Sequence, residues 1–359
     1  MSDPITATKK SSHHYVLVSC VDTYGGHALA YHLATELQRR PGMIKKHWRV
    51  RALCHNLEGL QDLVAMDVDL QQVDYKNPMI LKAQMKHVKC VIVVPDQTEY
   101  RVVNACNIID AASMHGVKRM QLISLIGCDY AGESTPMGGY NTIEGHLRNV
   151  YAYGRWCVFR VPMVHQLFYF WSRMVTQDKC VGMPISPDTE FTVIDIQDVC
   201  DAMVTMLLSP RKQDVDVEED LFDIPDAAVK RIYDLTGTCP YTGGAVAYRL
   251  NEALGGEAGE ITFQELDEES FRHYLESLGQ QHPPAQDPHG RRDPFRPDPR
   301  RVLVPATIDL MMDCFRVARE TRQMGIVKDD ARNLIGRQPK DLSQFFIDNQ
   351  DQFRDEKID

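Results

Sequence analysis

The sequence contains no apolar run near the ~20 residues that a helix needs to cross a membrane. Its start has neither the basic stretch nor the apolar core of a secretory leader, so secretion is not expected. The 10 cysteines occur singly, without a C-x-x-C pair, and H-E-x-x-H is absent, so we expect no zinc site. Unpaired cysteines are typical of small buried residues in a reducing compartment, and we therefore expect a cytoplasmic or nuclear protein.

An excess of positive charge is also missing, because the net charge is −10. Non-specific nucleic-acid binding depends on Lys and Arg contacts to phosphates, so we expect no direct contact with nucleic acid. The 43% hydrophobic and 25% charged fractions are those of an ordinary globular protein, and 359 residues fit one large domain or two joined ones. Any macromolecular partner is therefore expected to be a protein, and no membrane contact is expected.

Residues 15–29, YVLVSCVDTYGGHAL, join an apolar run to a short polar turn and then to a helical pattern. This order of strand, tight loop and helix N-terminus is the unit that binds a dinucleotide pyrophosphate in Rossmann folds. The three glycine positions of a G-x-x-G-x-x-G loop fall on Cys20, Thr23 and Gly26. Only the last is glycine, so the loop is predicted to keep its scaffold while its contacts to phosphate are weakened.

The substitutions in this loop oppose phosphate binding for distinct reasons. Cys20 adds a Cβ in the tight turn, and Thr23 adds a branched side chain where a pyrophosphate would approach. Asp22 adds a negative charge, and a repulsion of one charge pair at ~5 Å and an effective dielectric of ~20 amounts to roughly 3 kcal/mol. Gly25 and Gly26 still leave the helix N-terminus open to an anion, and Asp22 turned aside would serve as a helix cap.

Strand-like and helical patterns alternate over the first 162 residues. Strands are expected at 15–18, 48–54, 70–74, 90–94, 120–124 and 157–161, and helices at 25–39, 78–87, 98–115 and 140–153, with Val102, Val103, Cys106, Ile109 and Ala112 of the third helix facing the sheet. This alternation predicts an α/β fold, a doubly wound parallel Rossmann sheet. We expect a flexible tail over 1–14 and the Rossmann domain over 15–162.

Beyond residue 162 the pattern changes, and 163–359 is expected to form mainly a smaller second domain. The aromatic stretch 166–175 is interpreted as a buried helix or interdomain wall, with a ligand-pocket wall as the alternative. An acidic surface loop is expected at 213–226, or else a partner contact. A strand is expected at 231–235, and helices at 244–254, 268–278, 305–324 and 341–353. The Pro/Arg-rich insertion 279–301 is either disordered or a functional loop.

Several stretches, in order along the chain, resemble the NmrA-like family of atypical short-chain dehydrogenases. They are the loop region 15–29, residues 116–127 (GVKRMQLISLIG), 144–148 (EGHLR) with 156–162 (WCVFRVP), 183–189 (MPISPDT) with 195–198 (DIQD), 233–237 (YDLTG) and 334–346 (LIGRQPKDLSQFF). The resemblance implies a Rossmann domain and a smaller, discontinuous α+β C-terminal domain, some of whose segments return to the Rossmann sheet, with a cleft between the two. Family members include NAD(P)-binding redox sensors, negative transcriptional regulators and true reductases.

The catalytic pair of short-chain dehydrogenases, Tyr-x-x-x-Lys, is missing, because none of the 14 tyrosines has a lysine four residues later. Tyr140, on the expected helix, has Glu144 there, and a carboxylate raises a tyrosine pKa where a lysine would lower it. The lysine that reductases of this family use near the place of Tyr140 is absent too. Lone histidines such as His146 and His165 are weak candidates for acid–base chemistry. We therefore predict no catalytic residues.

A dinucleotide site is nevertheless the candidate site, with NAD or NADP binding predicted to be weakened or lost. From the motif and the resemblance, its residues are Cys20, Thr23, Tyr24, Gly25, Gly26, His55, Asn56, Asp74, Pro95 and Ser124. His55-Asn56 after the second strand indicates neither NAD nor NADP, and Ser124 is either a ligand contact or a strand cap. The function expected is a non-catalytic regulator that acts through a protein partner such as a transcription factor. The alternatives are a divergent NAD(P)-dependent oxidoreductase and a purely structural interaction module.

Overall fold

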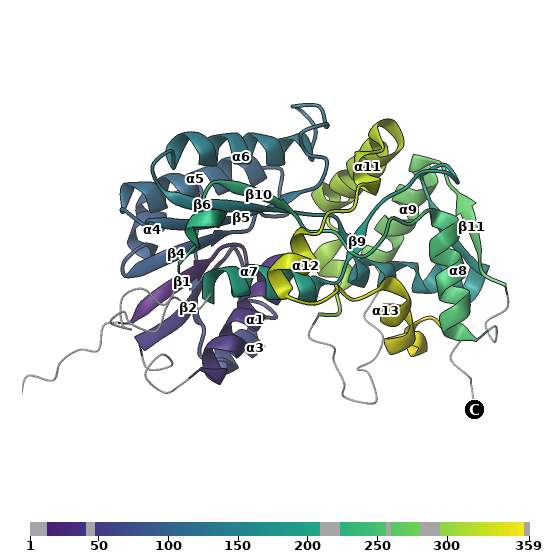
Figure 1. The fold of residues 1–359 in the computed structure, drawn as a ribbon, viewed down its shortest axis with the longest axis horizontal. Coiled ribbons are helices and arrows are strands. Elements are labelled where there is room, and N and C mark those ends of the chain that lie inside the picture. Colours follow the sequence, from purple (N-terminus) through teal and green to yellow (C-terminus); the bar gives the residue numbers. More distant parts are fainter. Residues whose placement is uncertain (1–12, 41–46, 209–222, 256–259, 281–294, 355–359) are drawn as a thin grey trace, which may run out of the picture.

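The computed structural model describes residues 13–40, 47–208, 223–255, 260–280 and 295–354. Within these ranges a 7-stranded parallel sheet has the order β10-β6-β5-β4-β1-β2-β3 (Figure 1). Its strands are β1 (His14–Val18), β2 (Trp48–Cys54), β3 (Asp69–Gln72), β4 (Val88–Val93), β5 (Arg119–Leu125), β6 (Arg155–Val161) and β10 (Arg231–Asp234). The order reverses between β1 and β4, which is where open α/β sheets bind ligands. The predicted α/β Rossmann class is confirmed.

Helices cover both faces of this sheet (Figure 1). One face carries α1 (Tyr24–Arg39), α3 (Gln61–Ala65) and α7 (Ile196–Leu208), and the other α4 (Pro78–Gln84), α5 (Arg101–Met114) and α6 (Gly138–Val150). Alternate residues of β1 therefore enter different cores: Val16 and Val18 pack on the α1 side, and Leu17 packs on the α5 side. Burial on both faces explains why the central strands β1 and β4 are largely apolar, whereas the edge strand β3 is polar.

Segments after residue 162 do return to the sheet. Strand β10 pairs with β6, α7 packs beside α1, and α12 (Asp330–Ile335) packs on α7. The orientation predicted for α5 was partly wrong, because Val103 is 51% exposed whereas Ala105, Ile108 and Ala112 are buried. The expected tail, acidic loop and insertion fall largely outside the described residues. Of the acidic loop, Asp223 is buried and paired with Arg119, so the surface-loop prediction is wrong for this residue, whereas Asp226 is exposed.

The remaining elements build the second half of the molecule. They are β7 (Met163–Val164), β8 (Cys180–Met183), β9 (Val193–Ile194), β11 (Thr262–Glu265), α8 (Gly243–Leu254), α9 (Glu268–Gly279), α10 (Pro299–Val302), α11 (Pro305–Thr321), α13 (Leu342–Asp348) and the short helices η1 (His165–Trp171), η2 (Met174–Asp178), η4 (Gln323–Gly325) and η5 (Gln350–Gln352). A further short helix, η3 (Asp226–Ala228), belongs to the sheet half, where Ala228 packs in the core on the α1 side. Strand β8 pairs with β11 and β7 with β9, both in parallel. Among the described residues, no helix has the length and apolarity required to cross a bilayer.

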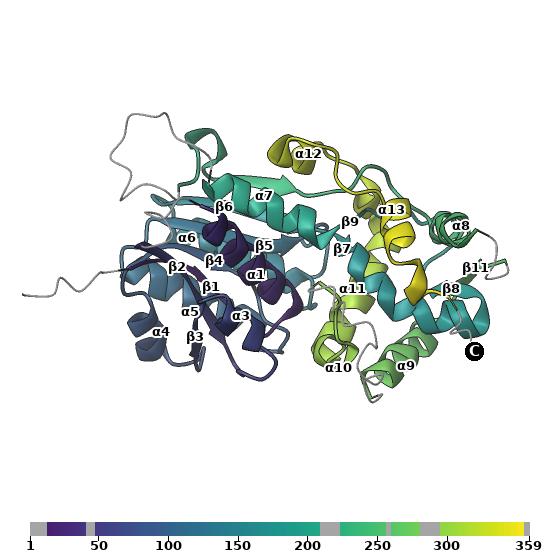
Figure 2. The same cartoon turned by 90° about the horizontal axis from the view of Figure 1, so that it is seen from below.

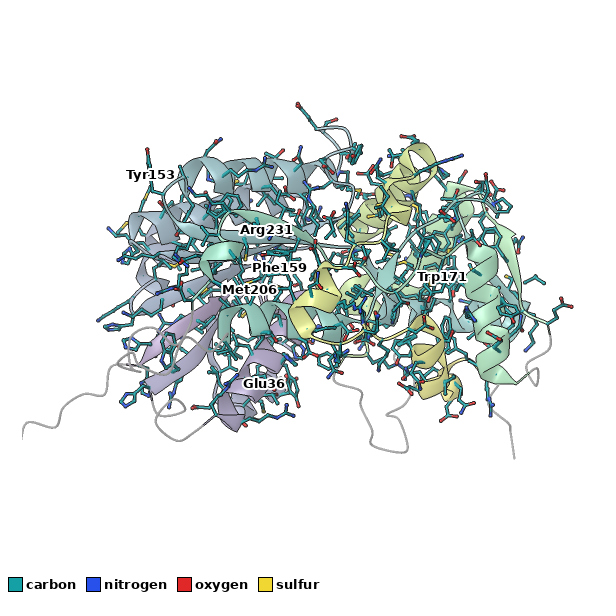
Figure 3. All side chains as sticks on the ribbon, in the orientation of Figure 1. Glu36, Tyr153, Phe159, Trp171, Met206 and Arg231 are labelled. Carbon is teal, nitrogen blue, oxygen red and sulfur yellow. The ribbon has the colours of Figure 1, made fainter. Side chains whose placement is uncertain are left out.

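Aromatic side chains of η1 form the core of this second half. Phe168 and Trp171 are buried there, and Phe168 contacts Phe346 of α13 edge-on at 5.6 Å between ring centroids. Figure 3 shows Trp171 in this half and Phe159 within the sheet, in separate cores. The aromatic stretch thus forms a buried helix, as one interpretation held, of the 3-10 type over His165–Trp171, and its Leu167 also lines the cavity described below. Figure 2 shows α11 at the junction of the two halves.

Gly26 brings α1 close to the end of β1, and this contact yields a test of the fold. A Cβ on Gly26 would lie 2.3 Å from the carbonyl oxygen of Cys20, whereas one on Gly25 would meet no atom within 4 Å. We expect Gly26→Ala to lower the free energy of unfolding by about 1–3 kcal/mol, because backbone must move to admit the methyl group. Gly25→Ala, the matched control, should leave it unchanged or raise it slightly. Urea denaturation measures both, and equal losses would contradict the packing.

Candidate functional site

The loop between β1 and α1 keeps the backbone of a Rossmann loop with only the last of its three motif glycines, Gly26. Cys20 has φ of +50°, in the left-handed region that favours glycine, and its side chain is buried. The Thr23 hydroxyl donates to the Cys20 carbonyl oxygen (2.6 Å) and accepts from the Gly26 N–H (3.2 Å), so Thr23 is the N-cap of α1. The loop is therefore stabilised by its own side chains.

Asp22 has turned away from the helix N-terminus toward the end of β2. One oxygen of its carboxylate accepts the backbone N–H groups of His55 (2.8 Å) and Asn56 (3.1 Å). The helix cap that the sequence allowed for Asp22 is supplied by Thr23 instead. In Rossmann folds the residues after the second strand contact the adenosine ribose, so Asp22 occupies N–H donors at the place where that ribose would lie.

A buried carboxylate lies beside this contact, at the end of β4. Asp96 is 1% exposed; it hydrogen-bonds the His55 ring (3.2 Å) and accepts from the Asn104 amide (2.5 Å) and from the N–H and hydroxyl of Thr98. Burial alone would raise the pKa of Asp96, but these hydrogen bonds outweigh it and hold the pKa at about 2. The same hydrogen bond raises the pKa of His55, against the effect of its partial burial.

Tyr75 completes this group, which we call the adenosine-side cluster: Cys20, Asp22, His55, Tyr75 and Asp96. The Tyr75 hydroxyl accepts the Cys20 N–H at 2.8 Å, and its ring lies 4.5 Å from that of His55. Ligand atoms of Cys20, His55 and Asp96 lie within 4.8 Å of one another, close enough for a metal ion. Both Asp96 oxygens are already hydrogen-bonded, however, and burial raises the pKa of the Cys20 thiol, which opposes the thiolate that a metal requires.

On α6, Glu144 lies one helical turn after Tyr140 and is completely buried. Its two oxygens accept from Arg160 at 2.9 and 3.0 Å, a bidentate pair, and one of them also accepts the Ser124 hydroxyl at 2.7 Å. Ser124 itself is fully buried. Ser124 at the end of β5 and Glu144, at the position of the lysine in Tyr-x-x-x-Lys, therefore belong to one buried ion-pair network.

A cavity of about 230 Å³ remains at the carboxyl edge of the sheet, between its central strands and α11. Its walls are mostly apolar and include Val94, Ile123, Leu125, Val161, Met163, Leu167, Leu310, Met311, Phe315, Ala318 and Met324. Thr23, Tyr24, Gly25 and Pro95 form its sheet-side wall, and Tyr140 also lines it. Arg101 is the single charged side chain among the lining residues.

The end of the 279–301 region passes over this site. Residues 281–294 lie outside the described part of the chain, but the carbonyl oxygen of Phe295 accepts the Tyr24 hydroxyl at 2.5 Å. Val302 of α10 lines the cavity, and Arg301 donates to the carbonyl oxygen of Gly59 at 3.3 Å. The segment 295–302 therefore lies across the N-terminus of α1, beside the place where a pyrophosphate would bind.

Comparison with known proteins identifies the family. The model of the NmrA-like family matches residues 41–221, about half of the chain. The chain belongs to the NmrA-like family. A sequence search of curated proteins finds no match.

Solved structures share the fold of this NmrA-like chain at low identity. They include an NADPH-dependent quinone oxidoreductase of Escherichia coli with NADPH (TM-score 0.67, 16% identity, 93% of this chain and 99% of that one). A triphenylmethane reductase of Citrobacter sp. with NADP(H) has the same values. NmrA, a negative transcriptional regulator in complex with NAD, gives a TM-score of 0.63 at 14% identity, covering 94% and 95% of the two chains.

The structure distributes the predicted site residues of this NmrA-like protein over three environments. Thr23, Tyr24, Gly25 and Pro95 line the cavity; Cys20, Gly26 and Ser124 are buried beneath it; His55, Asn56 and Asp74 lie at the adenosine side. Asp74 is exposed, and its carboxylate accepts the Lys76 N–H. As a cofactor-binding set the ten residues stay a prediction.

Sequence reasoning missed Arg101, Tyr75 and Asp96. Arg101 falls on the stripe of Ala105, Ile108 and Ala112, so a charged residue on the buried face of a helix was the available signal. Tyr75 and Asp96 follow β3 and β4 in stretches that match no motif. Their roles depend on contacts with loops distant in sequence.

The buried contacts of Glu144 with Arg160 and Ser124 should contribute strongly to the free energy of unfolding. We expect Glu144→Gln to lower the free energy of unfolding by about 3 kcal/mol or more, because Arg160 then keeps only one carboxylate partner, Asp129 at 2.9 Å. Arg148→Gln is the matched control, since Arg148 contacts Glu144 at 3.3 Å from a half-exposed position and should cost less than about 1 kcal/mol. Chemical denaturation measures both variants. Equal small losses would show that Glu144 is not held as described.

The hydrogen bond between His55 and Asp96 predicts that the free energy of unfolding depends on pH. The raised pKa of His55 gives stability that is complete below its unfolded value of about 6.5 and is lost as pH rises through the folded pKa. The lowered pKa of Asp96 acts oppositely: its contribution is present above 3.8 and is lost as pH falls toward about 2. We expect unfolding free energy to fall from pH 6 to 9, and His55→Gln, which retains a neutral donor, to flatten that slope. An unchanged slope would refute the contact.

Proposed function

We propose that this NmrA-like protein is a non-catalytic regulator with a degenerate NAD(P) site, which acts through a protein partner. The observation that carries the proposal is Glu144. A short-chain dehydrogenase needs a cation there to lower the tyrosine pKa and hold the ribose. This chain has a buried carboxylate paired with Arg160, and it hydrogen-bonds the serine at the strand end.

The adenosine-side cluster supports the degenerate site. Asp22 holds the N–H groups after β2, and His55 is bound to Asp96, so a dinucleotide would have to displace both contacts. The hydrogen bond from the Tyr24 hydroxyl to the Phe295 carbonyl oxygen places the backbone of residue 295 close to where a pyrophosphate would bind. The fold shared with NmrA, which is described as a negative transcriptional regulator, favours a transcription factor as the partner.

A divergent NAD(P)-dependent oxidoreductase is the second candidate, favoured by one observation. Tyr140 lines the cavity, and the Arg101 guanidinium carbon lies 5.4 Å from its ring centroid. Burial nevertheless raises the pKa of Tyr140, and Arg101 only partly opposes this. The fold shared with reductases also supports this second candidate function. NADPH oxidation in the presence of quinones would establish it and contradict the regulator.

The double change Cys20→Gly with Asp22→Thr tests whether the loop between β1 and α1 limits dinucleotide binding. Glycine suits the positive φ at residue 20, and removal of Asp22 frees the N–H groups of His55 and Asn56 and deletes a negative charge. We expect NADPH to bind at least about tenfold more tightly to the variant, a gain of about 1.4 kcal/mol. Asp351→Thr, a surface change in the second half, is the control and should have no effect. Unchanged affinity in the double variant would show that the loop is not limiting.

A further inference from the structure

We propose that the cavity binds a small apolar molecule with one anionic head group, of the carboxylate class, and that Arg101 binds the head. The cavity shares Thr23, Tyr24, Gly25 and Pro95 with the predicted dinucleotide site, so this inference rests on the degenerate site proposed above and not on the identity of a partner. It rests on the partners of Arg101, on unpaired hydroxyl groups in the cavity wall and on the size and polarity of the cavity.

Arg101 is a buried cation without a counter-ion. Its side chain is 5% exposed, at the start of α5. Its Nε donates to the carbonyl oxygen of Asp96 at 2.8 Å, and its two terminal nitrogens reach the carbonyl oxygens of Pro136 and Ala306 only at 3.5 Å. A guanidinium has five N–H donors, and contacts at 3.5 Å are weak hydrogen bonds.

No carboxylate among the described residues pairs with Arg101. Asp96, whose backbone carbonyl oxygen accepts from Arg101, directs both of its carboxylate oxygens to His55, Asn104 and Thr98. Buried charges in proteins are normally paired, because an isolated charge loses its hydration without compensation. An anion in the cavity would supply the missing pair, as a charge-assisted and bidentate contact.

Unpaired hydroxyl groups in the same wall independently indicate a polar ligand atom. Thr192 is 1% exposed, lines the cavity, and its hydroxyl has no hydrogen-bond partner. The hydroxyl of Thr307, another lining residue, is also buried and unpaired, and Thr307 follows Ala306, whose carbonyl Arg101 contacts. Leaving such a group unpaired costs about 1–3 kcal/mol, which a ligand would recover on binding.

The size and polarity of the cavity indicate what the rest of the ligand is like. Apart from these groups and the side chains of Thr23, Tyr24, Gln97 and Tyr140 it is apolar. Its volume of about 230 Å³ is below the ~300–1,000 Å³ of sites for drug-sized molecules. A dinucleotide is too large and too polar for this space. A compact hydrocarbon or aromatic body with a single carboxylate matches both the walls and the charge.

The test compares decanoate with decanol, which share a chain and differ in the head group, by calorimetric titration of the full-length protein. We expect wild-type protein to bind decanoate at least about tenfold more tightly than decanol. Arg101→Met should reduce this preference to within about twofold while decanol binding persists. Equal binding of the two probes to wild type, or a preference that survives in Arg101→Met, would overturn the proposal.

Two further variants keep the test decisive if Arg101→Met fails to fold. Arg101→Lys retains the charge and should retain the preference for decanoate. Thr192→Val should not destabilise the ligand-free protein, because it removes an unpaired hydroxyl, yet it should weaken decanoate binding. A Thr192→Val protein that loses stability while decanoate affinity is unchanged would contradict a ligand-facing hydroxyl. ADP-ribose competing with decanoate through Arg101 would reassign the residue to a pyrophosphate and also overturn the proposal.

Discussion

A carboxylate removed from water must be matched by cations or N–H donors, and this constraint organises the carboxyl edge of the sheet. Asp96 takes its donors from His55, Asn104 and Thr98, and Glu144 takes Arg160 and Ser124. The Asp96 contacts connect the loops after β4 and β2, and the Glu144 contacts connect α6 to β5 and β6, so these elements are fixed relative to one another. A ligand that uses the same groups would have to displace these contacts.

The consequence is a cleft whose two ends differ. At the adenosine side, polar groups bind one another, and Asp22 holds the backbone donors after β2. At the other side, the cavity between the sheet and α11 is open, apolar and lined by one buried cation, Arg101. A fold that its solved neighbours share can therefore differ from them in what it recognises, because the scaffold and the site depend on different residues.

Local sequence patterns predicted the fold well. The bounds of β2 and nearly those of α1 follow from apolar runs and from the proline and glycine that end them. The exchange of a lysine for Glu144 was also readable, because residues four apart share a helix face. Sequence patterns did not predict features that depend on contacts between distant parts of the chain. These are the partner of Asp22, the burial of Asp223 and the unpaired position of Arg101. Nor did periodicity alone place Val103, which faces solvent from an otherwise apolar stretch.

The central claim is that the dinucleotide site is internally satisfied, and calorimetric titration of the unmodified protein with NAD⁺, NADH, NADP⁺ and NADPH tests it most directly. The account predicts no saturation with any of the four at concentrations up to about 1 mM, which corresponds to binding weaker than about 4 kcal/mol. Saturable binding of any one of them with a dissociation constant of about 1 μM would contradict it.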